Sequence, residues 1–119
     1  MVSFMASGKV VAIFIFLIVG LGVLLYYDGI IGTNKINTLD DNMVGQKVRI
    51  RGIVDSRISF LGFNAISVKD DTGSITVTVP EHLSLPPEGV YVVVEGILKD
   101  NGGTLYIEAE SIHQPLFFH

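Results

Sequence analysis

The feature that most constrains this chain is an uncharged apolar run near its N-terminus. Residues 10–27 read VVAIFIFLIVGLGVLLYY and contain no charged or strongly polar side chain. At about 1.5 Å per residue a helix of this length spans about 27 Å, close to the roughly 30 Å of a bilayer core. Ile30 and Ile31 continue the apolar reach. The run therefore predicts one transmembrane helix over residues 10–31, preceded by a short N-terminal tail at residues 1–9.

A cleaved signal peptide is the alternative interpretation of the same run. Such a peptide has a shorter apolar region, followed by small residues at the cleavage site. Here the run ends in Tyr26, Tyr27 and Asp28. Tyrosines are enriched at the membrane interface, and this ending favours a retained anchor in contact with the lipid bilayer.

The charges that flank the run bear on its orientation. Lys9 precedes it, whereas Asp28 and Lys35 follow it. By the positive-inside rule this small difference favours a cytoplasmic N-terminus. We therefore expect a single-pass membrane protein with an extracytoplasmic C-terminal domain.

The rest of the chain is acidic and free of cysteine. Residues 28–119 carry seven Lys or Arg against twelve Asp or Glu, a formal charge of −5. Segment 32–46 is expected to be a tether with a short helical turn, in which Thr38 caps the sequence TLDD and Asp41 follows three residues later. The absence of Cys excludes disulfides and cysteine-based zinc or thiol chemistry.

From Lys47 onward the hydrophobic residues recur with a period of two, which indicates half-buried strands. In the first strand the predicted inner face holds Val48, Ile50, Gly52, Val54, Ser56, Ile58 and Phe60, and the outer face holds Lys47, Arg49, Arg51 and Arg57. Gly52 predicts a bulge or bend. The sequences DDTG and KDNGG predict hairpin turns, and three prolines exclude a strand from residues 80–89. The five expected strands cover residues 47–60, 64–69, 74–79, 90–98 and 104–110.

Three stretches, TLDDNMVGQKVRIRGIVDS, ISVKDDTGSITVTV and GVYVVVEGIL, resemble the small OB-fold domains of the nucleic-acid-binding, tRNA-anticodon type. The resemblance covers residues 38–112. It implies an all-β fold, a five-stranded OB-fold (Greek-key) barrel over residues 47–112, preceded by the one transmembrane α-helix and followed by a hydrophobic C-terminal tail at residues 113–119. The helix that this family carries between its third and fourth strands is replaced by a proline-rich loop, so Leu83 and Leu85 are expected to fill that end of the barrel.

The same resemblance implies a binding face for single-stranded nucleic acid. OB domains bind oligonucleotides on strands two and three and on the adjoining loops, through cations and aromatic stacking platforms. The candidate residues are Arg49, Arg51, Arg57, Phe60, Phe63, Lys69, Thr76, Thr78, Tyr91 and Tyr106. An alternative interpretation of the cations stays open, since the first strand pairs with the fourth in this topology. Arg49 and Arg51 would then lie near Glu95 and Tyr91 as ordinary cross-strand neighbours.

A second resemblance involves the tail sequence HQPLF. The anchor, the small barrel and a histidine after the last strand are similar to the haem chaperone of cytochrome c maturation, which attaches haem to the histidine of an H-x-x-x-Y stretch. That resemblance implies haem contact at His113 and Phe117, although Phe117 stands where the tyrosine belongs. Otherwise no cofactor is expected, and the three isolated histidines lack the spacing of a metal site.

No sequence motif of a hydrolase, kinase, metalloprotease or dinucleotide-binding enzyme is present. The acidic pairs fall in a helix start and a hairpin turn, where Asp is expected for local hydrogen bonds. We therefore expect a non-catalytic binding module. An extracytoplasmic chaperone, or an assembly partner of another membrane protein that uses a sheet edge or Tyr91 and Val93, is the alternative.

Overall fold

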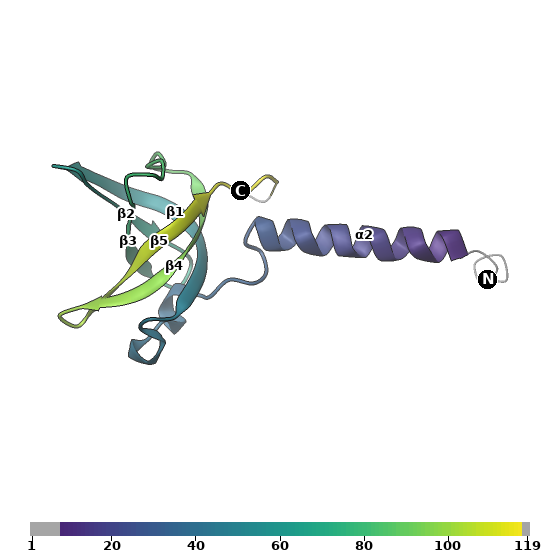
Figure 1. Ribbon diagram of the computed structural model, residues 1–119, viewed down its shortest axis with the longest axis horizontal. Helices are drawn as coiled ribbons and strands as arrows, with labels where there is room; N and C mark the ends of the chain where they lie inside the picture. The colour runs from purple at the N-terminus through teal and green to yellow at the C-terminus, as the bar shows by residue number, and fades with distance from the viewer. Residues whose placement is uncertain (1–7, 118–119) are drawn as a thin grey trace.

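The computed structural model describes residues 8–117, which form one long helix and one small barrel (Figure 1). Helix α2, Gly8–Tyr27, has no buried residue, and it is long and apolar enough to cross a membrane or to serve as a signal sequence. The molecule measures 66 × 30 × 25 Å, because the helix extends away from the barrel. Most of the expected N-terminal tail, residues 1–7, lies outside the described residues, as do the last two residues of the C-terminal tail.

The helix ends at Tyr27, four residues before the predicted end. Gly29 adopts a left-handed conformation with φ 79°. Its N–H donates to the carbonyl of Tyr26 (3.1 Å), and the N–H of Ile30 donates to the carbonyl of Leu25 (2.9 Å). This pair of bonds is a Schellman motif, which closes a helix at a glycine. The hydrophobicity of Ile30 and Ile31 extends the apolar surface but not the helix.

The barrel contains the five predicted strands in the order β1-β2-β3-β5-β4, and it is closed. β3 and β5 pair in parallel, whereas the other four pairings are antiparallel. The long β1 pairs with β2 along one part of its length and with β4 along another, so it bends around the barrel (Figure 1). The strands are β1 Lys47–Phe60, β2 Phe63–Lys69, β3 Ser74–Thr78, β4 Tyr91–Asn101 and β5 Thr104–His113.

The predicted faces of β1 are correct only as far as Val54. Val54 pairs with Val68 and Ser56 with Ser67, so Asp55 is an extra, bulged residue. A bulge inverts the alternation, and Arg57 therefore pairs with the inward Ile66. The prediction that Ser56, Ile58 and Phe60 continue the inner face is wrong for this reason.

Gly52 lies where β1 changes partner from β4 to β2, so of the two predicted alternatives the bend is present here, whereas the bulge lies at Asp55. A Cβ atom at this position would overlap the carbonyl oxygen of Lys69 in β2. Glycine thus permits the close backbone approach that closes the barrel. Gly96 in β4 meets the carbonyl oxygen of Glu108 in the same way.

β5 reaches His113, three residues beyond the expected strand. Gly96 pairs with Ala109 and Glu95 with Ser111, so Glu110 is bulged in turn. The shift returns Ile112 to a position opposite Val94 and places His113 opposite Val93. The alternation of apolar and polar residues along β5 therefore breaks at Glu110, where the bulge lies.

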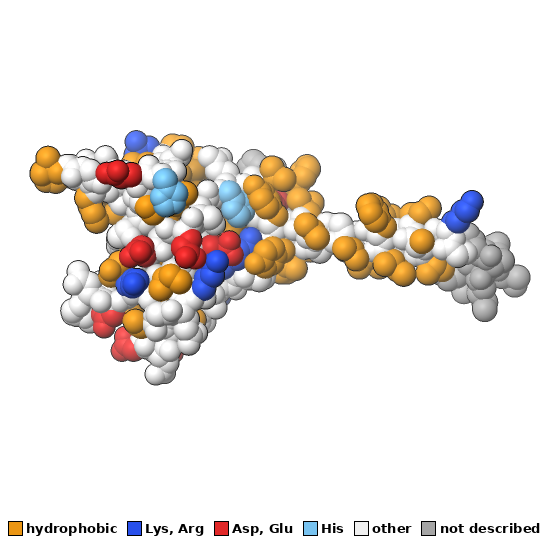
Figure 2. Space-filling view, viewed as in Figure 1, with side chains coloured by type: hydrophobic (Ala, Val, Ile, Leu, Met, Phe, Trp, Pro, Cys, Tyr) orange, Lys and Arg blue, Asp and Glu red, His pale blue; other side chains and the backbone are white. Residues whose placement is uncertain are grey.

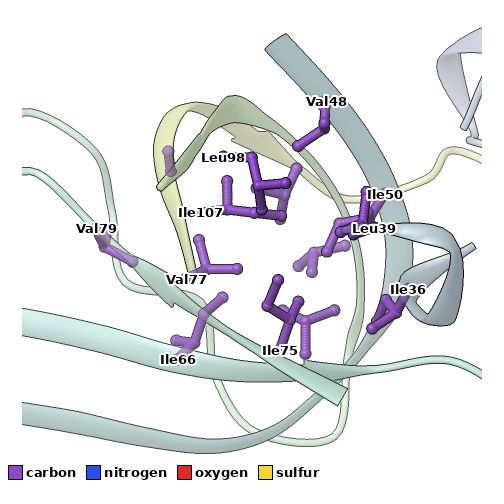
Figure 3. Close-up of a cluster of buried hydrophobic side chains, with 14 of the residues drawn as sticks. Ile36, Leu39, Val48, Ile50, Ile66, Ile75, Val77, Val79, Leu98 and Ile107 are labelled. Atoms are coloured by element: carbon purple, nitrogen blue, oxygen red, sulfur yellow. The ribbon is translucent and has the colours of Figure 1, made fainter. Parts of the chain in front are cut away.

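The barrel interior is filled by aliphatic side chains from all five strands (Figure 3). Ile36 and Leu39 of the predicted tether are also buried in this core, while Leu83 and Leu85 of the proline-rich loop are half-buried against it. Segment 32–46 is therefore packed against the barrel.

The two short turns of this segment differ from the predicted one. They are the 3-10 helices η1 Ile36–Thr38 and η2 Asp41–Met43. The side chain of Asp40 caps η2 by accepting from the N–H of Asn42 (3.0 Å). The hydroxyl of Thr38 instead donates to the carbonyl of Lys35 (2.6 Å), so the predicted cap at Thr38 is wrong.

Candidate binding face and helix–barrel junction

A pocket of about 340 Å³ lies on the outer surface of the sheet, and we call it the outer-face pocket. Thr76 pairs across the sheet with Ser67 on one side and with Tyr106 on the other. The short outward side chains of Ser67 and Thr76 leave a hollow beside the Tyr106 ring. The pocket is lined by Phe63, Thr76, Thr78, Asn101, Thr104 and Tyr106.

A second hollow of about 280 Å³ continues this surface, because Phe63 and Thr78 line both. Its charged lining residues are Glu81 and Glu108. Within the described part of the chain, no Lys or Arg lines either hollow. The face therefore combines aromatic, hydroxyl and carboxylate groups.

The hairpin between β1 and β2 carries an exposed apolar tip next to the pocket. Leu61, at its turn, has φ 51°, which is uncommon for a residue with a side chain. The tip points away from helix α2 (Figures 1 and 2). We define the apolar tip by its four exposed side chains, Ile58 (57% exposed), Phe60 (68%), Leu61 (91%) and Phe63 (53%).

Arg49 lies at the opposite end of the barrel, against the end of α2. Its side chain is only 8% exposed, and its Nε lies 3.6 Å from the Glu95 carboxylate. Its guanidinium lies 3.9 Å from the centre of the Tyr26 ring, and Nη1 donates to the carbonyl of Ile31 (3.5 Å). The predicted proximity of Arg49 to Glu95 is confirmed.

Arg51 also contacts the helix end. Its Nε donates to the carbonyl of Asp28 (2.9 Å), and its guanidinium lies 4.5 Å from the centre of the Tyr91 ring. The two arginines thus hold the exit of α2 against β1 and β4. Val93 of β4, predicted to be available to a partner, is fully buried, and its side chain lies directly beneath Gly29.

The remaining two candidate cations do not contact the helix end but have partners within the barrel domain. Arg57 donates to the carbonyl of Pro86 (3.4 Å) in the proline-rich loop, and Lys69 pairs with Asp55 (3.4 Å). None of the four candidate cations lines the outer-face pocket.

The C-terminal tail folds onto the same helix end. The carboxylate of Asp28 is fully buried and accepts from the backbone N–H groups of Leu116 (2.6 Å) and Phe117 (2.9 Å). His113 stacks on the Tyr27 ring at 4.2 Å, and its Nε2 donates to the carbonyl of Tyr27 (2.7 Å). The bond to the Tyr27 carbonyl occupies Nε2, one of the two ring nitrogens of the predicted haem contact His113.

A cleft of about 580 Å³ lies between segment 29–35 and the barrel. It brings together Arg51, Lys69 and Tyr91 of the predicted set, but Asp70 and Asp71 line it as well. Burial alone would raise the pKa of Asp70, yet hydrogen bonds from Thr72, Ile36 and Gly73 outweigh burial and lower this pKa. Among residues 8–117, no cluster of three or more His, Asp or Glu side chains could hold a metal ion.

Solved structures share the shape of this barrel. Asparaginyl-tRNA synthetase from Pyrococcus horikoshii matches with a TM-score of 0.63 at 20% identity, over 72% of this chain and 24% of the synthetase chain. OBody AM3L15 bound to hen egg-white lysozyme matches with 0.63 at 18% identity, over 69% of this chain and 87% of the other. The barrel is an OB fold. A replication protein A heterotrimer bound to ssDNA matches with 0.54 at 27% identity, over 63% and 60% of the two chains.

These similarities establish the fold, and the synthetase match involves only about a quarter of that enzyme. No protein-family model matches the sequence, and no curated protein matches it. In OB folds the ligand face lies on strands two and three and the adjoining loops. The outer-face pocket occupies this region.

The structure therefore divides the predicted site residues into groups. Phe63, Thr76, Thr78 and Tyr106 meet at the outer-face pocket, with Phe60 on the adjoining tip. Arg49, Arg51, Tyr91, His113 and Phe117 belong to the junction with the helix. Sequence reasoning missed Asn101 and Thr104 of the pocket, although the predicted turn at residues 99–103 could have indicated them. It also missed the role of Asp28.

Proposed function

We propose that this protein is a non-catalytic, membrane-anchored OB-fold module that binds a partner protein on its outer-face pocket and apolar tip. One observation carries the proposal. The standard ligand region of the fold combines a pocket holding Tyr106 and Phe63 with four exposed apolar side chains at the tip, and its neighbouring charges are acidic. Exposed aromatic anchors in a polar surround are typical of protein interfaces.

A retained anchor is supported by the junction. Cleavage of the helix near its end would remove Tyr26 from Arg49 and Tyr27 from His113. Cleavage beyond Asp28 would also remove its buried carboxylate from the N–H groups of Leu116 and Phe117. The end of the helix is thus part of the packed structure of the barrel.

Electrostatics favours a protein over a nucleic acid as the ligand. Nucleic-acid affinity depends on Lys and Arg contacts with phosphates. Here the pocket lacks cations among the described residues, and Arg49 and Arg51 hold the helix end instead. The OBody neighbour is bound to lysozyme, which supports a protein as ligand for this kind of barrel. The replication protein A neighbour is bound to ssDNA, so nucleic acid is the competing outcome to be tested.

The experiment uses the full chain in membranes of its native host. A photoreactive benzoylphenylalanine at Phe63 should form a specific protein adduct, and a matched probe at the exposed Glu88, in the proline-rich loop, should not. Phe60→Ser together with Leu61→Ser should abolish the adduct at position 63. Equal labelling at the two positions would contradict the proposal.

The competing outcome needs its own measurement. The full chain in nanodiscs is titrated with a fluorescent single-stranded oligonucleotide at low ionic strength, where electrostatic binding is strongest. We expect no saturable binding. Saturable binding that Tyr106→Ala and Phe63→Ala abolish would replace the protein partner with a nucleic acid.

We further propose that the barrel is extracytoplasmic, as the flanking charges favour. Because the chain has no Cys, a single Glu88→Cys variant gives an unambiguous label. A membrane-impermeant maleimide should label it in intact cells. Labelling only after lysis would place the barrel in the cytoplasm.

A further inference from the structure

The junction of helix and barrel bears a second exposed apolar surface. Four side chains surround the exit of α2, and we call them the apolar collar: Ile30 (46% exposed), Ile31 (47%), Leu116 (60%) and Phe117 (71%). Two come from the turn after the helix and two from the C-terminal tail, 85 or more residues later in the sequence. Figure 2 shows hydrophobic side chains gathered where the helix meets the barrel.

We propose that the apolar collar inserts into the headgroup–acyl boundary of the bilayer, so that the barrel sits directly on the membrane in a fixed orientation. This inference rests on the proposed membrane anchor and goes beyond it. A tethered barrel would be held near the membrane by the helix alone. A collar in the lipid makes the barrel itself a part of the membrane interface.

The position of the collar next to α2 favours lipid as the surface that it contacts. The collar continues the surface of α2, whose apolar side chains are exposed along its length. Tyr26 and Tyr27, 47% and 39% exposed, are the last two residues of the helix and precede the collar. Tyrosines occupy the interface level of membranes, which places the collar at the depth of the headgroups.

The backbone of the collar supports the same conclusion. An irregular segment enters lipid at low cost only when its N–H groups are bonded within the protein. The N–H groups of Ile30 and Ile31 both donate to the carbonyl of Leu25 (2.9 and 3.4 Å). Those of Leu116 and Phe117 donate to the buried carboxylate of Asp28. All four collar residues thus present apolar side chains while their backbone donors are satisfied.

Two charged side chains of the junction, Asp28 and Arg49, are withdrawn from the collar surface. Asp28 is fully buried and Arg49 is 6% exposed. The carbonyl of Ile31 accepts from Arg49, so a collar acceptor is satisfied as well. Charges placed in this way do not oppose insertion, because they stay bonded to protein groups.

The consequence concerns the orientation of the binding face. The collar and helix meet the barrel at one end, and the apolar tip lies at the other (Figure 1). Stacking of His113 on Tyr27 and the bond from Arg51 to the Asp28 carbonyl resist swinging of the barrel. The outer-face pocket is therefore held away from the bilayer, open to a partner.

Tryptophan fluorescence tests the inference, because the chain has no Trp of its own. The full-length variant Phe117→Trp is reconstituted in liposomes of phosphatidylcholine, with or without bromine on the acyl chains. We expect blue-shifted emission, most of which the brominated lipid quenches. The matched control Leu61→Trp, at the apolar tip, should show red-shifted emission without quenching.

A third variant separates the collar from the anchor. Phe16→Trp, at an exposed position in the middle of α2, reports whether the helix itself is inserted. Quenching in Phe16→Trp but not in Phe117→Trp would overturn the collar and leave the anchor intact. No quenching in Phe16→Trp would overturn the anchor.

Two other results with Phe117→Trp have a defined meaning or a replacement variant. Blue-shifted emission from Phe117→Trp without quenching would mean that a second copy or another protein covers the collar, and it would overturn the proposal. If Phe117→Trp fails to fold, Ile31→Trp takes its place. Its side chain is also exposed on the collar, and the same two readouts apply.

Discussion

The carboxylate of Asp28 accepts a hydrogen bond of 2.6 Å from the backbone N–H of Leu116, 88 residues later in the chain. This contact joins the end of the helix to the C-terminal tail that follows the barrel's last strand. Because the carboxylate is fully buried, no solvent competes for it. The connection between the two parts of the molecule is therefore built by specific polar contacts as well as by covalent linkage.

Removal of this acceptor should release the tail. In Asp28→Ala, two backbone N–H groups lose their partner, at a cost of about 1–3 kcal/mol. We expect a lower thermal stability of the full chain in detergent and faster hydrogen exchange at residues 116 and 117. Asp28→Asn keeps one acceptor oxygen and should have a smaller effect. Unchanged exchange in Asp28→Ala would show that the tail is held by other contacts.

Arg49 should matter for the stability of the junction between helix and barrel. Arg49→Ala removes the contact with the Tyr26 ring and the cation that pairs with the Glu95 carboxylate. We expect the free energy of unfolding to fall by about 1–3 kcal/mol. Arg49→Lys keeps the charge but not the planar group, and it should recover only part of the loss. Urea unfolding of the full chain in detergent measures both. The control Lys47→Ala affects an exposed pair with Glu110 and should cost less than about 1 kcal/mol.

Gly52→Ala should destabilise the barrel strongly. The added methyl group would meet the carbonyl oxygen of Lys69, a backbone atom that cannot move without disturbing β2. We expect a loss of about 2 kcal/mol or more in the free energy of unfolding. Gly73→Ala is the matched control, because the nearest atom to its Cβ lies 3.8 Å away. Equal stability of the two variants would contradict this account of Gly52.

The fold was largely predictable because its signals are local. The alternation of Ile75 and Val77 with polar residues, the turn at residues 99–103 and the glycine in β1 are all readable in short windows. The bulges at Asp55 and Glu110 were not predictable. Each is defined by a residue without a partner on the adjacent strand. The pattern of residues within one strand does not reveal its register against the neighbouring strand.

The site was predictable in part for the same reason. Outward positions on β3 and β5 follow from the alternation, and they brought Thr76 and Tyr106 into the candidate set. The binding partner of Asp28 could not be predicted, because a backbone N–H has no residue-type signature. Alternation placed Arg49 outward but could not show that the helix end covers it.

Asp70 should make stability depend on pH in the acidic range. Its carboxylate accepts hydrogen bonds from the backbone N–H groups of Ile36, Thr72 and Gly73 and from the Thr72 hydroxyl. Together these bonds outweigh burial and lower its pKa. A folded-state pKa below the unfolded value means that the stabilisation is fully present above the unfolded pKa of about 4. It is lost as the pH falls through the lower, folded-state pKa.

The comparison with Asp70→Asn isolates this contribution, since the other carboxylates titrate alike in both proteins. At pH 7 we expect the wild type to be more stable by about 1–2 kcal/mol. Below about pH 4 the difference should shrink, because the protonated aspartate resembles the amide. Urea unfolding of the full chain in detergent at a series of pH values measures the difference. A difference that stays constant down to pH 2 would show that Asp70 stabilises η1 and the hairpin turn without its charge.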